Sequence, residues 1–525
     1  MARVETTNDA LGDSTEMSVA AADPAEPLIE IACGTLKDLR QHEGELRPIT
    51  LDSSLDHDLG LDSLARVELF MRIERELGVR LPDSLFQTAE TLRDIATVLD
   101  SARPAIRIAR QSPTEITRTK ARTATPPPNI ATLNQLLAWQ VERQPDFAHI
   151  TICGDGADEI VTYEQLWREA HSIAGGLQRQ GIRLGDTVAL MLPTSRDYFC
   201  AFFGVLVAGA VPVPLYPPTR LSQIEEHVRR HAGILTNAGA IILITTADMR
   251  RLAAVLRVHA PSLRRITTNE ELRSLRAAPT RVTPNAGSTA LLQYTSGSTG
   301  QPKGVVLSHE NVLANISALG AALGVSSDDV FVSWLPLYHD MGLIGAWLGT
   351  LYFGMQLVIM SPLSFLTRPV RWLEAIHRYR GTLSAAPNFA YELCLKRVTD
   401  EELAGLDLST WRIAMNGAEA VMPETLPRFR DRFARCGFQP TAMTPVYGLA
   451  ECSVGLTVPP LERGPLIDAI EREPFMHGGV ASPVGPNAAN PLRFVSCGLP
   501  IPGYQVRIVD DAGRELGERR EGRLE

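Results

Sequence analysis

The chain has 525 residues, 45% of them hydrophobic and 21% charged, which is an ordinary globular composition with room for roughly three or four domains. The net charge of −9 and the pI near 5.8 argue against nucleic-acid and anionic-membrane partners, and no basic stripe with interleaved aromatic residues occurs. Seven cysteines are scattered without C-x-x-C spacing, so neither a zinc site nor a disulfide framework is indicated, and a reduced cytoplasm fits.

Residues 1–26 are polar and acidic without an apolar core, which excludes a secretory signal and predicts a disordered tail. Two uncharged runs, 198–215 and 341–367, could pass a hydropathy window. Because glycine and proline interrupt them, we interpret both as buried helix-then-strand pieces, the second with a helix to Gly354 and a strand over 355–360. The sequence therefore predicts no transmembrane segment.

An acidic unit follows over 27–101, where residues 28–100 include 15 acidic and 8 basic side chains. Within it, the stretch Asp58-Leu59-Gly60-Leu61-Asp62-Ser63-Leu64 precedes a predicted helix whose apolar residues Leu64, Val67 and Met71 share one face. Ser63 thus lies at a helix N-terminus. A serine there can simply cap the helix, or it can carry a phosphate that the helix N-terminus stabilises.

Residues 102–130 form a predicted linker that ends in three prolines, 126–128. Positions 101–129 hold 6 basic residues and 1 acidic residue, with almost no apolar periodicity. A flexible linker of this length has a root-mean-square span of roughly 30 Å and gives effective concentrations of about a millimolar. An acidic unit joined in this way can reach the next domain without a strong docking interface.

From Leu133 to the end, apolar strands alternate with helical stretches. This alternation predicts an α/β domain over 131–525 with parallel sheets covered by helices. The clearest predicted strands are 187–192, 240–245, 330–335, 355–360 and 412–415, and the clearest predicted helices are 308–323 and 423–436.

One stretch of this domain, 294–304, has the composition of a polyphosphate-binding loop: Tyr294-Thr295-Ser296-Gly297-Ser298-Thr299-Gly300-Gln301-Pro302-Lys303-Gly304. It follows the apolar run 290–292, and its glycines let backbone N–H groups face anionic oxygens while its hydroxyls add donors. Lys303 supplies a flexible charge, and only three other lysines occur in the chain. The spacing is neither a Walker A loop nor G-x-G-x-x-G, and a plain Ser/Gly surface turn is the alternative.

The stretch resembles the phosphate loop of the adenylate-forming enzymes, which include acyl-CoA synthetases, nonribosomal-peptide adenylation domains and fatty-acyl-AMP ligases. Three further segments resemble that family in order and spacing: Trp334-Leu335-Pro336-Leu337-Tyr338-His339-Asp340, Asn416-Gly417-Ala418-Glu419-Ala420 and Tyr447-Gly448-Leu449-Ala450-Glu451. The second segment departs from the family's frequent Pro after Glu.

This resemblance implies a role for each segment. Lys303 and the loop residues Thr295, Ser296, Gly297, Ser298, Thr299 and Gly300 would hold the β- and γ-phosphates of ATP. Glu451 would help to hold Mg²⁺, and His339 would lie beside the reacting carboxylate. Gly417, Ala418, Glu419, Tyr447 and Gly448 would form the nucleotide site, with the adenine between the first three and Tyr447.

The acidic unit resembles an acyl carrier protein, an all-α domain of four helices whose serine carries 4′-phosphopantetheine. This resemblance assigns the attachment to Ser63 and implies a phosphopantetheinyl transferase as a partner. At its other end the chain stops where the family continues toward a ribose-binding Asp and a small C-terminal domain with a catalytic lysine. We therefore interpret the adenylation domain as truncated or as the front of a longer protein.

Among adenylate-forming enzymes, three features favour a fatty-acyl-AMP ligase. First, the segment 209–218 resembles the corresponding segment of fatty-acyl-AMP ligases. Second, 46 residues separate Glu451 from Gly498, and acyl-CoA synthetases usually have fewer residues there. Third, an acyl acceptor attached to the same chain makes free CoA unnecessary. Phe202, Phe203 and the apolar run 341–344 suit a lipid-sized pocket, although plain core packing explains them equally well.

The predicted activity is ATP- and Mg²⁺-dependent activation of a fatty acid and its transfer to the arm on Ser63, feeding an acyltransferase or polyketide synthase. An acyl-CoA or amino/aryl-acid synthetase is the first alternative. The second is an acyl-binding carrier module whose catalysis is incomplete without a C-terminal domain.

Overall fold

The computed structural model divides into two units, Met1–Arg107 and Ile108–Glu525. Residues 1–24 of the predicted tail, most of the predicted linker and the loop residues 296–301 lie outside the described residues, whereas residues 25 and 26, predicted to belong to the disordered tail, are helical. The structure describes residues 25–39, 49–55, 58–59, 61, 63–77, 79, 81–82, 85, 88–99, 126–127, 129–154, 156–217, 224–295, 302–485 and 490–525.

The first unit contains helices α1 (Ala25–Leu39), α2 (Ser63–Leu77) and α4 (Leu92–Leu99). Helix α1 begins two residues before the predicted start of the acidic domain. Helix α2 begins at Ser63, which confirms the helix predicted there. The core of this unit is built from side chains of all three helices, which include Leu28, Leu36, Leu69, Phe70, Ile73, Leu92 and Ile95.

The second unit is built around a seven-stranded sheet, in which every neighbouring pair is parallel except β1 with β2. The four central strands β9 to β12 bury every residue, as strands covered on both faces do. In spatial order the strands are β13 (Met443–Pro445), β12 (Ile413–Asn416), β11 (Leu383–Ala386), β9 (Val330–Ser333), β10 (Gln356–Ile359), β1 (Ala148–Ile152) and β2 (Glu159–Thr162).

A second, fully parallel sheet has the order β4 (Val211–Pro214), β3 (Thr187–Met191), β5 (Ile242–Thr245) and β6 (Arg265–Thr267). An antiparallel hairpin joins β7 (Thr289–Thr295) to β8 (Lys303–Ser308). Short antiparallel pairs complete the unit: β14 (Thr457–Val458) with β17 (Leu499–Pro500), β15 (Ile467–Ile470) with β16 (Leu492–Val495), and β18 (Ile508–Val509) with β19 (Arg523–Leu524).

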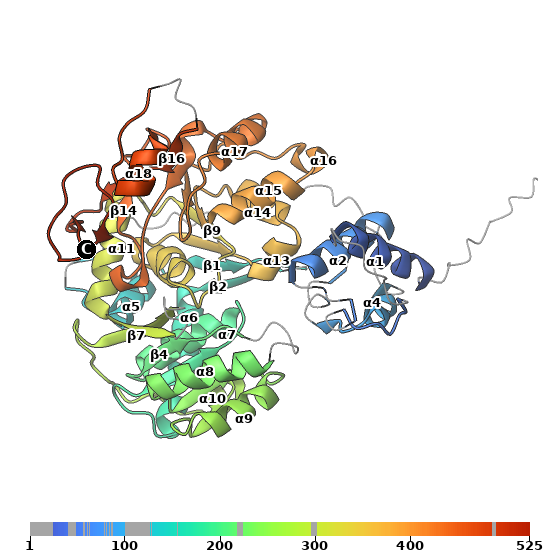
Figure 1. Ribbon diagram of the computed structural model, residues 1–525. Helices are drawn as coiled ribbons and strands as arrows, with labels where there is room; N and C mark the ends of the chain where they lie inside the picture. The colour runs from blue at the N-terminus through green and yellow to red at the C-terminus, as the bar shows by residue number, and fades with distance from the viewer. Residues whose placement is uncertain are drawn as a thin grey trace, which may run out of the picture. The chain divides into compact units, whose positions relative to one another are not determined.

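Amphipathic helices pack on these sheets. Helix α14, for example, buries Val370, Leu373 and Ile376 on one face, and Figure 1 shows α8, α9 and α10 together in green. The helices are α5 (Leu133–Arg143), α6 (Tyr163–Arg179), α7 (Arg196–Val207), α8 (Ile224–Ala238), α9 (Arg250–His259), α10 (Asn269–Ser274), α11 (His309–Ala322), η2 (Met341–Leu348), α12 (Gly349–Phe353), α13 (Pro362–Thr367), α14 (Val370–Tyr379), α15 (Asn388–Arg397), α16 (Asp400–Leu403), α17 (Thr425–Phe433), η3 (Ala434–Cys436), η4 (Pro440–Ala442), η5 (Ala450–Cys452) and α18 (Arg472–Gly478).

The predicted alternation of strands and helices is confirmed. The predicted strands correspond to β3, β5, β9, β10 and β12, each within two residues at either end, and the helix predicted over 308–323 is α11 with Ser308 as its N-cap. The two uncharged runs are α7 followed by β4, and the π-helix η2 and α12 followed by β10. Among the helices that the structure describes, none is both long and apolar enough to cross a membrane.

A half-buried ion pair ties the sheet to the loop that precedes β9. Arg412 donates to Asp329 through Nε at 2.9 Å and Nη2 at 2.7 Å, and Thr382 Oγ1 donates to the same carboxylate at 2.7 Å. Although burial alone raises the pKa of Asp329, the hydrogen bonds from Arg412, Ser326 and Thr382 outweigh it and hold this pKa below its ordinary value. Such a carboxylate stabilises the fold above its unfolded-state pKa and loses that effect as the pH falls through the folded-state pKa.

We expect Arg412→Ala to lower the free energy of unfolding by about 2–3 kcal/mol at pH 7, because it leaves the Asp329 carboxylate, 7% exposed, without its cation. Urea titration followed by circular dichroism measures the loss. The difference from wild type should shrink as the pH falls below about 4, the ordinary pKa of Asp, and through the lower folded-state pKa of Asp329. The matched control is Arg428→Ala, whose pair with Glu392 is more exposed (56% and 29%) and should contribute less than about 1 kcal/mol. Equal losses in the two variants would contradict this account.

Candidate active site

Three of the four segments that resemble the family follow strands of the seven-stranded sheet and leave it at the same edge. Because β9, β11, β12 and β13 are parallel, their carboxyl ends lie together, which is where open α/β sheets bind ligands. Segment 334–340 follows β9, segment 417–420 follows β12, and segment 446–451 follows β13. Asn416 and Pro445, the last residues of β12 and β13, pair directly, so the two loops begin side by side.

The ends of the predicted phosphate loop come from the β7–β8 hairpin. Thr295 and Lys303 pair across the hairpin, and seven residues lie between them in the sequence. The side chain of Lys303 is exposed. The predicted phosphate ligands Ser296, Gly297, Ser298, Thr299 and Gly300 lie outside the described residues, so the structure leaves their role a prediction.

Segment 334–340 is held from both sides. Tyr198 Oη donates to the Leu337 carbonyl at 2.6 Å, and Gln293 Nε2 donates to the Tyr338 carbonyl at 2.8 Å. The side chain of His339 reaches solvent, yet the surrounding protein and then the charge of Arg230 lower its pKa. A neutral imidazole at pH 7 follows from both effects.

Asp340 begins the π-helix η2, and its carboxylate accepts a hydrogen bond from Met341 N–H at 2.7 Å. Burial raises the pKa of Asp340, this hydrogen bond opposes the increase, and the charge of Glu451 adds to it. The two carboxylates are therefore close enough to interact, and a cation between them would be stabilised.

The loop after β12 has an unusual backbone. Ala418 has φ of 67°, a left-handed conformation that non-glycine residues seldom adopt. A Cβ on Gly417 would lie 2.7 Å from the Val446 carbonyl oxygen, so this loop runs against the one after β13. Glu419 Oε1 accepts a hydrogen bond from Phe389 N–H at 2.6 Å, at the start of α15. The close packing of Gly417 and the hydrogen bond to Glu419 hold this loop in place, and residues 418–420 remain exposed.

The loop after β13 is equally constrained. The backbone of Tyr447 pairs with Thr457 in both directions, at 3.2 and 3.0 Å, while its side chain remains 43% exposed. A Cβ on Gly448 would lie only 1.8 Å from the Val454 carbonyl oxygen, so this position requires glycine. Glu451 follows on the short helix η5, with an exposed side chain.

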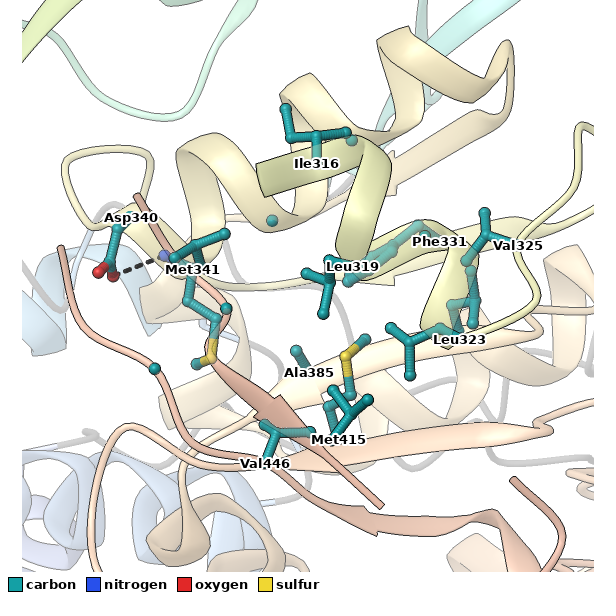
Figure 2. A pocket seen from close by; sticks show the side chains of 18 of the residues that line it. Ile316, Leu319, Leu323, Val325, Phe331, Asp340, Met341, Ala385, Met415 and Val446 are labelled. Carbon is teal, nitrogen blue, oxygen red and sulfur yellow. Dashed lines mark hydrogen bonds between the residues drawn. The ribbon is translucent and has the colours of Figure 1, made fainter. Parts of the chain in front are cut away.

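An apolar cavity opens at this edge of the sheet and runs between α11, η2 and the strands (Figure 2). It encloses about 900 Å³ of space not filled by atoms, part of it open to solvent. Figure 2 shows Asp340 and Met341 on one side, and Leu323, Val325 and Phe331 on the other. Asp340 is the sole ionisable carboxyl group of the lining, which is otherwise almost wholly apolar. The cavity thus suits a long hydrocarbon with a polar group at the Asp340 side.

A second cavity of about 1800 Å³ lies between the loop 418–424 and residues 490–497. It shares Ala418, Val446, Tyr447 and Gly448 with the apolar cavity. Glu419 lines the second cavity as well. Five residues outside the phosphate loop were predicted to form the nucleotide site, and four of them, Ala418, Glu419, Tyr447 and Gly448, line this cavity. The fifth, Gly417, does not. His339, Glu451 and Lys303 line neither cavity.

Of the run 341–344 predicted to suit a lipid-sized pocket, Met341 lines the apolar cavity. Gly345, Gly349 and Phe353 line it as well and were not predicted, although their four-residue spacing from Met341, visible in the sequence, puts them on one helical face. Asp340 belongs to a predicted segment but had no predicted role. The strand β16, inside the long segment between Glu451 and Gly498, lines the second cavity, and nothing in its sequence indicated this. Phe202 and Phe203 line neither cavity: both are buried in the core against Trp347.

The residues present fit a magnesium ion bound together with a nucleotide. Mg²⁺ in such sites takes one or two carboxylates, with phosphate oxygens and waters completing its shell. Glu451, with Asp340 near it, offers that donor set. Across the described ranges no three His, Cys, Asp or Glu side chains converge as a self-sufficient metal site.

Comparison with known proteins agrees with this geometry. Residues 137–525 match the family of AMP-binding enzymes, and residues 27–99 match the phosphopantetheine attachment site. The medium-chain-fatty-acid–[acyl-carrier-protein] ligase JamA of Moorena producens is 36% identical, over 73% of this chain and 66% of its own length. The long-chain-fatty-acid–AMP ligase FadD26 of Mycobacterium marinum is also 36% identical, over 71% and 65%. The chain spans just under two thirds of the length of these relatives.

Solved structures give the same result. The crystal structure of the fatty acid AMP ligase from Legionella pneumophila has a TM-score of 0.69 and 34% identity, over 75% of this chain and 68% of that one. The fatty acyl-adenylate ligase of that organism in complex with acyl adenylate and pyrophosphate gives the same values.

The fold, the paired cavities and these matches define an adenylate-forming enzyme, and the chain belongs to the AMP-binding enzyme family. It carries a phosphopantetheine attachment domain ahead of the adenylate-forming domain. Adenylate-forming enzymes use ATP and Mg²⁺, and attachment domains of this kind carry 4′-phosphopantetheine on a serine.

Proposed function

We propose that this protein is a fatty-acyl-AMP ligase that activates a fatty acid with ATP and passes the acyl group to the pantetheine arm on its own Ser63. The observation that carries the proposal is the junction of the two cavities at Ala418, Val446, Tyr447 and Gly448. An acid whose chain fills the apolar cavity would present its carboxylate at the wall of the nucleotide cavity. The relatives named above are ligases of fatty acids.

The chemistry needs two group transfers. A carboxylate oxygen of the acid attacks the α-phosphorus of ATP, pyrophosphate leaves with its electron pair, and an acyl-adenylate remains. A thiol then attacks the acyl carbon, the C–S bond forms, the bond to the AMP oxygen breaks, and the thiol proton goes to solvent. The protein contributes by aligning the reactants and by neutralising phosphate charge.

Lys303, Thr295 and the loop 296–300 would hold the β- and γ-phosphates, and Glu451 would bind Mg²⁺, which neutralises phosphate charge. Gly417, Ala418, Glu419, Tyr447 and Gly448 would form the adenosine site, for which the exposed Tyr447 ring offers a stacking face. His339 would lie beside the carboxylate of the fatty acid. Because its imidazole is neutral at pH 7, it would not repel a proton or a cation at that place.

The carrier part of the proposal rests on Ser63 as the first residue of α2, a position that stabilises an attached phosphate. We propose that residues 27–101 form a four-helix carrier domain, that 102–130 link it to the adenylation domain at 131–525, and that a phosphopantetheinyl transferase modifies Ser63. An acyltransferase or polyketide synthase would take the product. A cytoplasmic location fits the seven cysteines, all of which are free thiols.

Intact-mass spectrometry tests the proposal directly. The pantetheinylated protein is incubated with ATP, Mg²⁺ and a series of fatty acids, without CoA. We expect an acyl mass increment on the protein, release of AMP, and a preference among chain lengths. The Ser63→Ala variant, which cannot accept the arm, should form acyl-adenylate but gain no acyl mass.

The alternatives give different results. An acyl-CoA synthetase would release acyl-CoA once CoA is added and leave the arm unloaded. An amino- or aryl-acid synthetase would consume ATP only with those acids. A carrier module without catalysis would form no adenylate with any acid, and this result would refute the proposal.

A further inference from the structure

The β15–β16 hairpin forms one wall of the second cavity, across from the loop 418–424. Its register pairs Ala469 with Arg493 and Ile467 with Val495. Residues that pair directly in an antiparallel sheet, and residues two apart along a strand, share one face. Arg493 therefore lies on the same face as Val495, which lines the second cavity and packs against the hydrophobic core of the domain. This is the face of the hairpin that is turned toward the domain.

The other face of the hairpin meets helix α18. The register pairs Ile470 with Leu492 on that face, and the Phe494 ring lies 5.3 Å from the ring of Phe475 on α18. Leu492 and Phe494 also border the second cavity, but neither carries a polar group. Arg493 is thus the charged side chain that strand β16 contributes to this wall.

Hydrogen bonds hold the end of β16 beside the predicted nucleotide site. Thr457 Oγ1 donates to the Cys497 carbonyl at 2.9 Å, and the backbone of the same Thr457 pairs with Tyr447. Ser496 N–H donates to the Leu466 carbonyl at 2.9 Å. The strand that carries Arg493 is therefore tied to the residue that holds Tyr447 in place.

Two arginines line the second cavity. Arg472 is half-buried, and its guanidinium is engaged by Asn490: Nε donates to the Asn490 carbonyl at 3.3 Å, and Nη2 donates to Oδ1 at 3.2 Å. The side chain of Arg493 is exposed. Because a guanidinium carries five N–H donors and no acceptor, Arg493 offers a ligand in this cavity a strong set of hydrogen-bond donors.

Under the proposed function, the second cavity holds the adenosine end of ATP. Its lining includes Ala418 and Tyr447 of the predicted adenosine site, whereas Lys303 and Glu451, which would hold the phosphates and Mg²⁺, do not line it. The two faces of the adenine would meet the loop that contains Ala418 and the Tyr447 ring. The edge of the base is left for the wall that carries Arg493.

The polar groups of the two walls complement that edge. Adenine has an exocyclic amine that donates hydrogen bonds and ring nitrogens that accept them. Glu419 and Glu424 line one wall, and their carboxylates only accept. Arg493 lines the other wall and only donates. A ligand that presents both a donor and an acceptor fits between them.

We propose that Arg493 binds the adenine base of the nucleotide by donating hydrogen bonds from its guanidinium to a ring nitrogen. The long segment between Glu451 and Gly498 is then part of the nucleotide site, because its strand β16 carries the residue that reads the base. This assignment rests on the proposed function.

The test measures nucleotide binding directly. The full chain is titrated calorimetrically with ATP and Mg²⁺, without fatty acid. We expect Arg493→Ala to weaken the binding of ATP about tenfold, the usual effect of losing a charge-assisted hydrogen bond. AMP should lose the same factor, because it has the same base, whereas inorganic tripolyphosphate, which has no base, should bind both proteins equally.

Base analogues identify the bonded atom. The analogues 1-deaza-ATP, 3-deaza-ATP and 7-deaza-ATP each lack one ring nitrogen. One of them should bind wild type about tenfold more weakly than ATP does, and its affinity should not fall further in Arg493→Ala. The other two should behave as ATP does in both proteins.

Two control variants complete the design. Arg493→Lys keeps a charged donor and should stay within about threefold of wild type. Arg463→Ala removes an exposed arginine of the same segment that does not line the cavity, and it should bind every ligand as wild type does. Without nucleotide, all of these variants should melt at the wild-type temperature. In ATP–pyrophosphate exchange, Arg493→Ala should raise KM for ATP and leave KM for the fatty acid unchanged.

Other outcomes overturn the inference. A loss that is larger for ATP than for AMP, or that also affects tripolyphosphate, would place Arg493 on the phosphates. A loss that persists with all three analogues would exclude a bond to a ring nitrogen, and no loss would remove Arg493 from the site. A lower melting temperature of Arg493→Ala without nucleotide would mean a structural role. Wild-type protein that binds ATP as expected but forms no acyl-adenylate would refute the proposed activation and leave the assignment of Arg493 intact.

Discussion

Replacing Gly345 with tryptophan is expected to lower kcat/KM for long-chain fatty acids about 100-fold or more, while the shortest acids keep activity within about threefold. Gly345 lines the apolar cavity one helical turn beyond Met341, which lies at the Asp340 side. A Cβ added there would meet Val454 Cγ2 at 3.6 Å, an ordinary contact, so a side chain can start without distorting the helix. An indole would then fill the space that a long chain needs. ATP–pyrophosphate exchange across a series of chain lengths measures the effect.

Gly342 provides the control on the same helix. A Cβ there would lie 2.3 Å from the Pro336 carbonyl oxygen, so Gly342→Ala should lower the melting temperature and impair all acids alike. Gly345→Trp should instead melt close to wild type and discriminate by chain length. A variant that loses activity on short and long acids equally would show that this cavity does not hold the acyl chain.

Most of the fold could be predicted from the sequence because its strands and helices carry strong local patterns. The central strands are short apolar runs between glycine or polar breaks, such as 355–360, and parallel strands buried on both faces have that composition. The predicted strand boundaries differ from the structure by at most two residues, and a larger difference lies at a helix end. The helix predicted over 423–436 is α17, Thr425–Phe433, followed by the 3-10 turn η3, because the apolar period does not distinguish an α-helical from a 3-10 last turn.

The sequence segments of the candidate site could be predicted from the sequence, but the cavities that they line could not. Tyr447, Ala418 and Glu419 were recognisable because their segments resemble those of a known family. The residues Leu323, Val325 and Phe331 of the cavity wall were not predictable, since they come from the C-cap of α11, the turn after it and β9. No local pattern distinguishes a core leucine from one that faces a cavity.

The loop that joins both cavities is held by a buried amide. Asn315, on α11, donates through Nδ2 to the Gly455 carbonyl at 2.8 Å and accepts from Gly455 N–H at 3.1 Å, and its Nδ2 also donates to Tyr504 Oη. Residues 447–457 thus form a closed turn, with Tyr447 paired to Thr457 at its base. A turn tied at both ends cannot absorb an added atom by moving outward as a whole.

Gly448→Ala is therefore expected to reduce adenylate formation about 100-fold or more, because the added Cβ must move from 1.8 Å to at least 3.0 Å from the Val454 carbonyl oxygen. That displacement of more than 1 Å shifts Tyr447 and Glu451 on one side and Val454, which lines the apolar cavity, on the other. KM for ATP and KM for the acid should both rise, in contrast to Gly345→Trp, which should alter only the acid. Gly485→Ala, with nothing within 4 Å of its new Cβ, should leave ATP–pyrophosphate exchange unchanged. Wild-type exchange rates in Gly448→Ala would mean that this turn is not part of the active site.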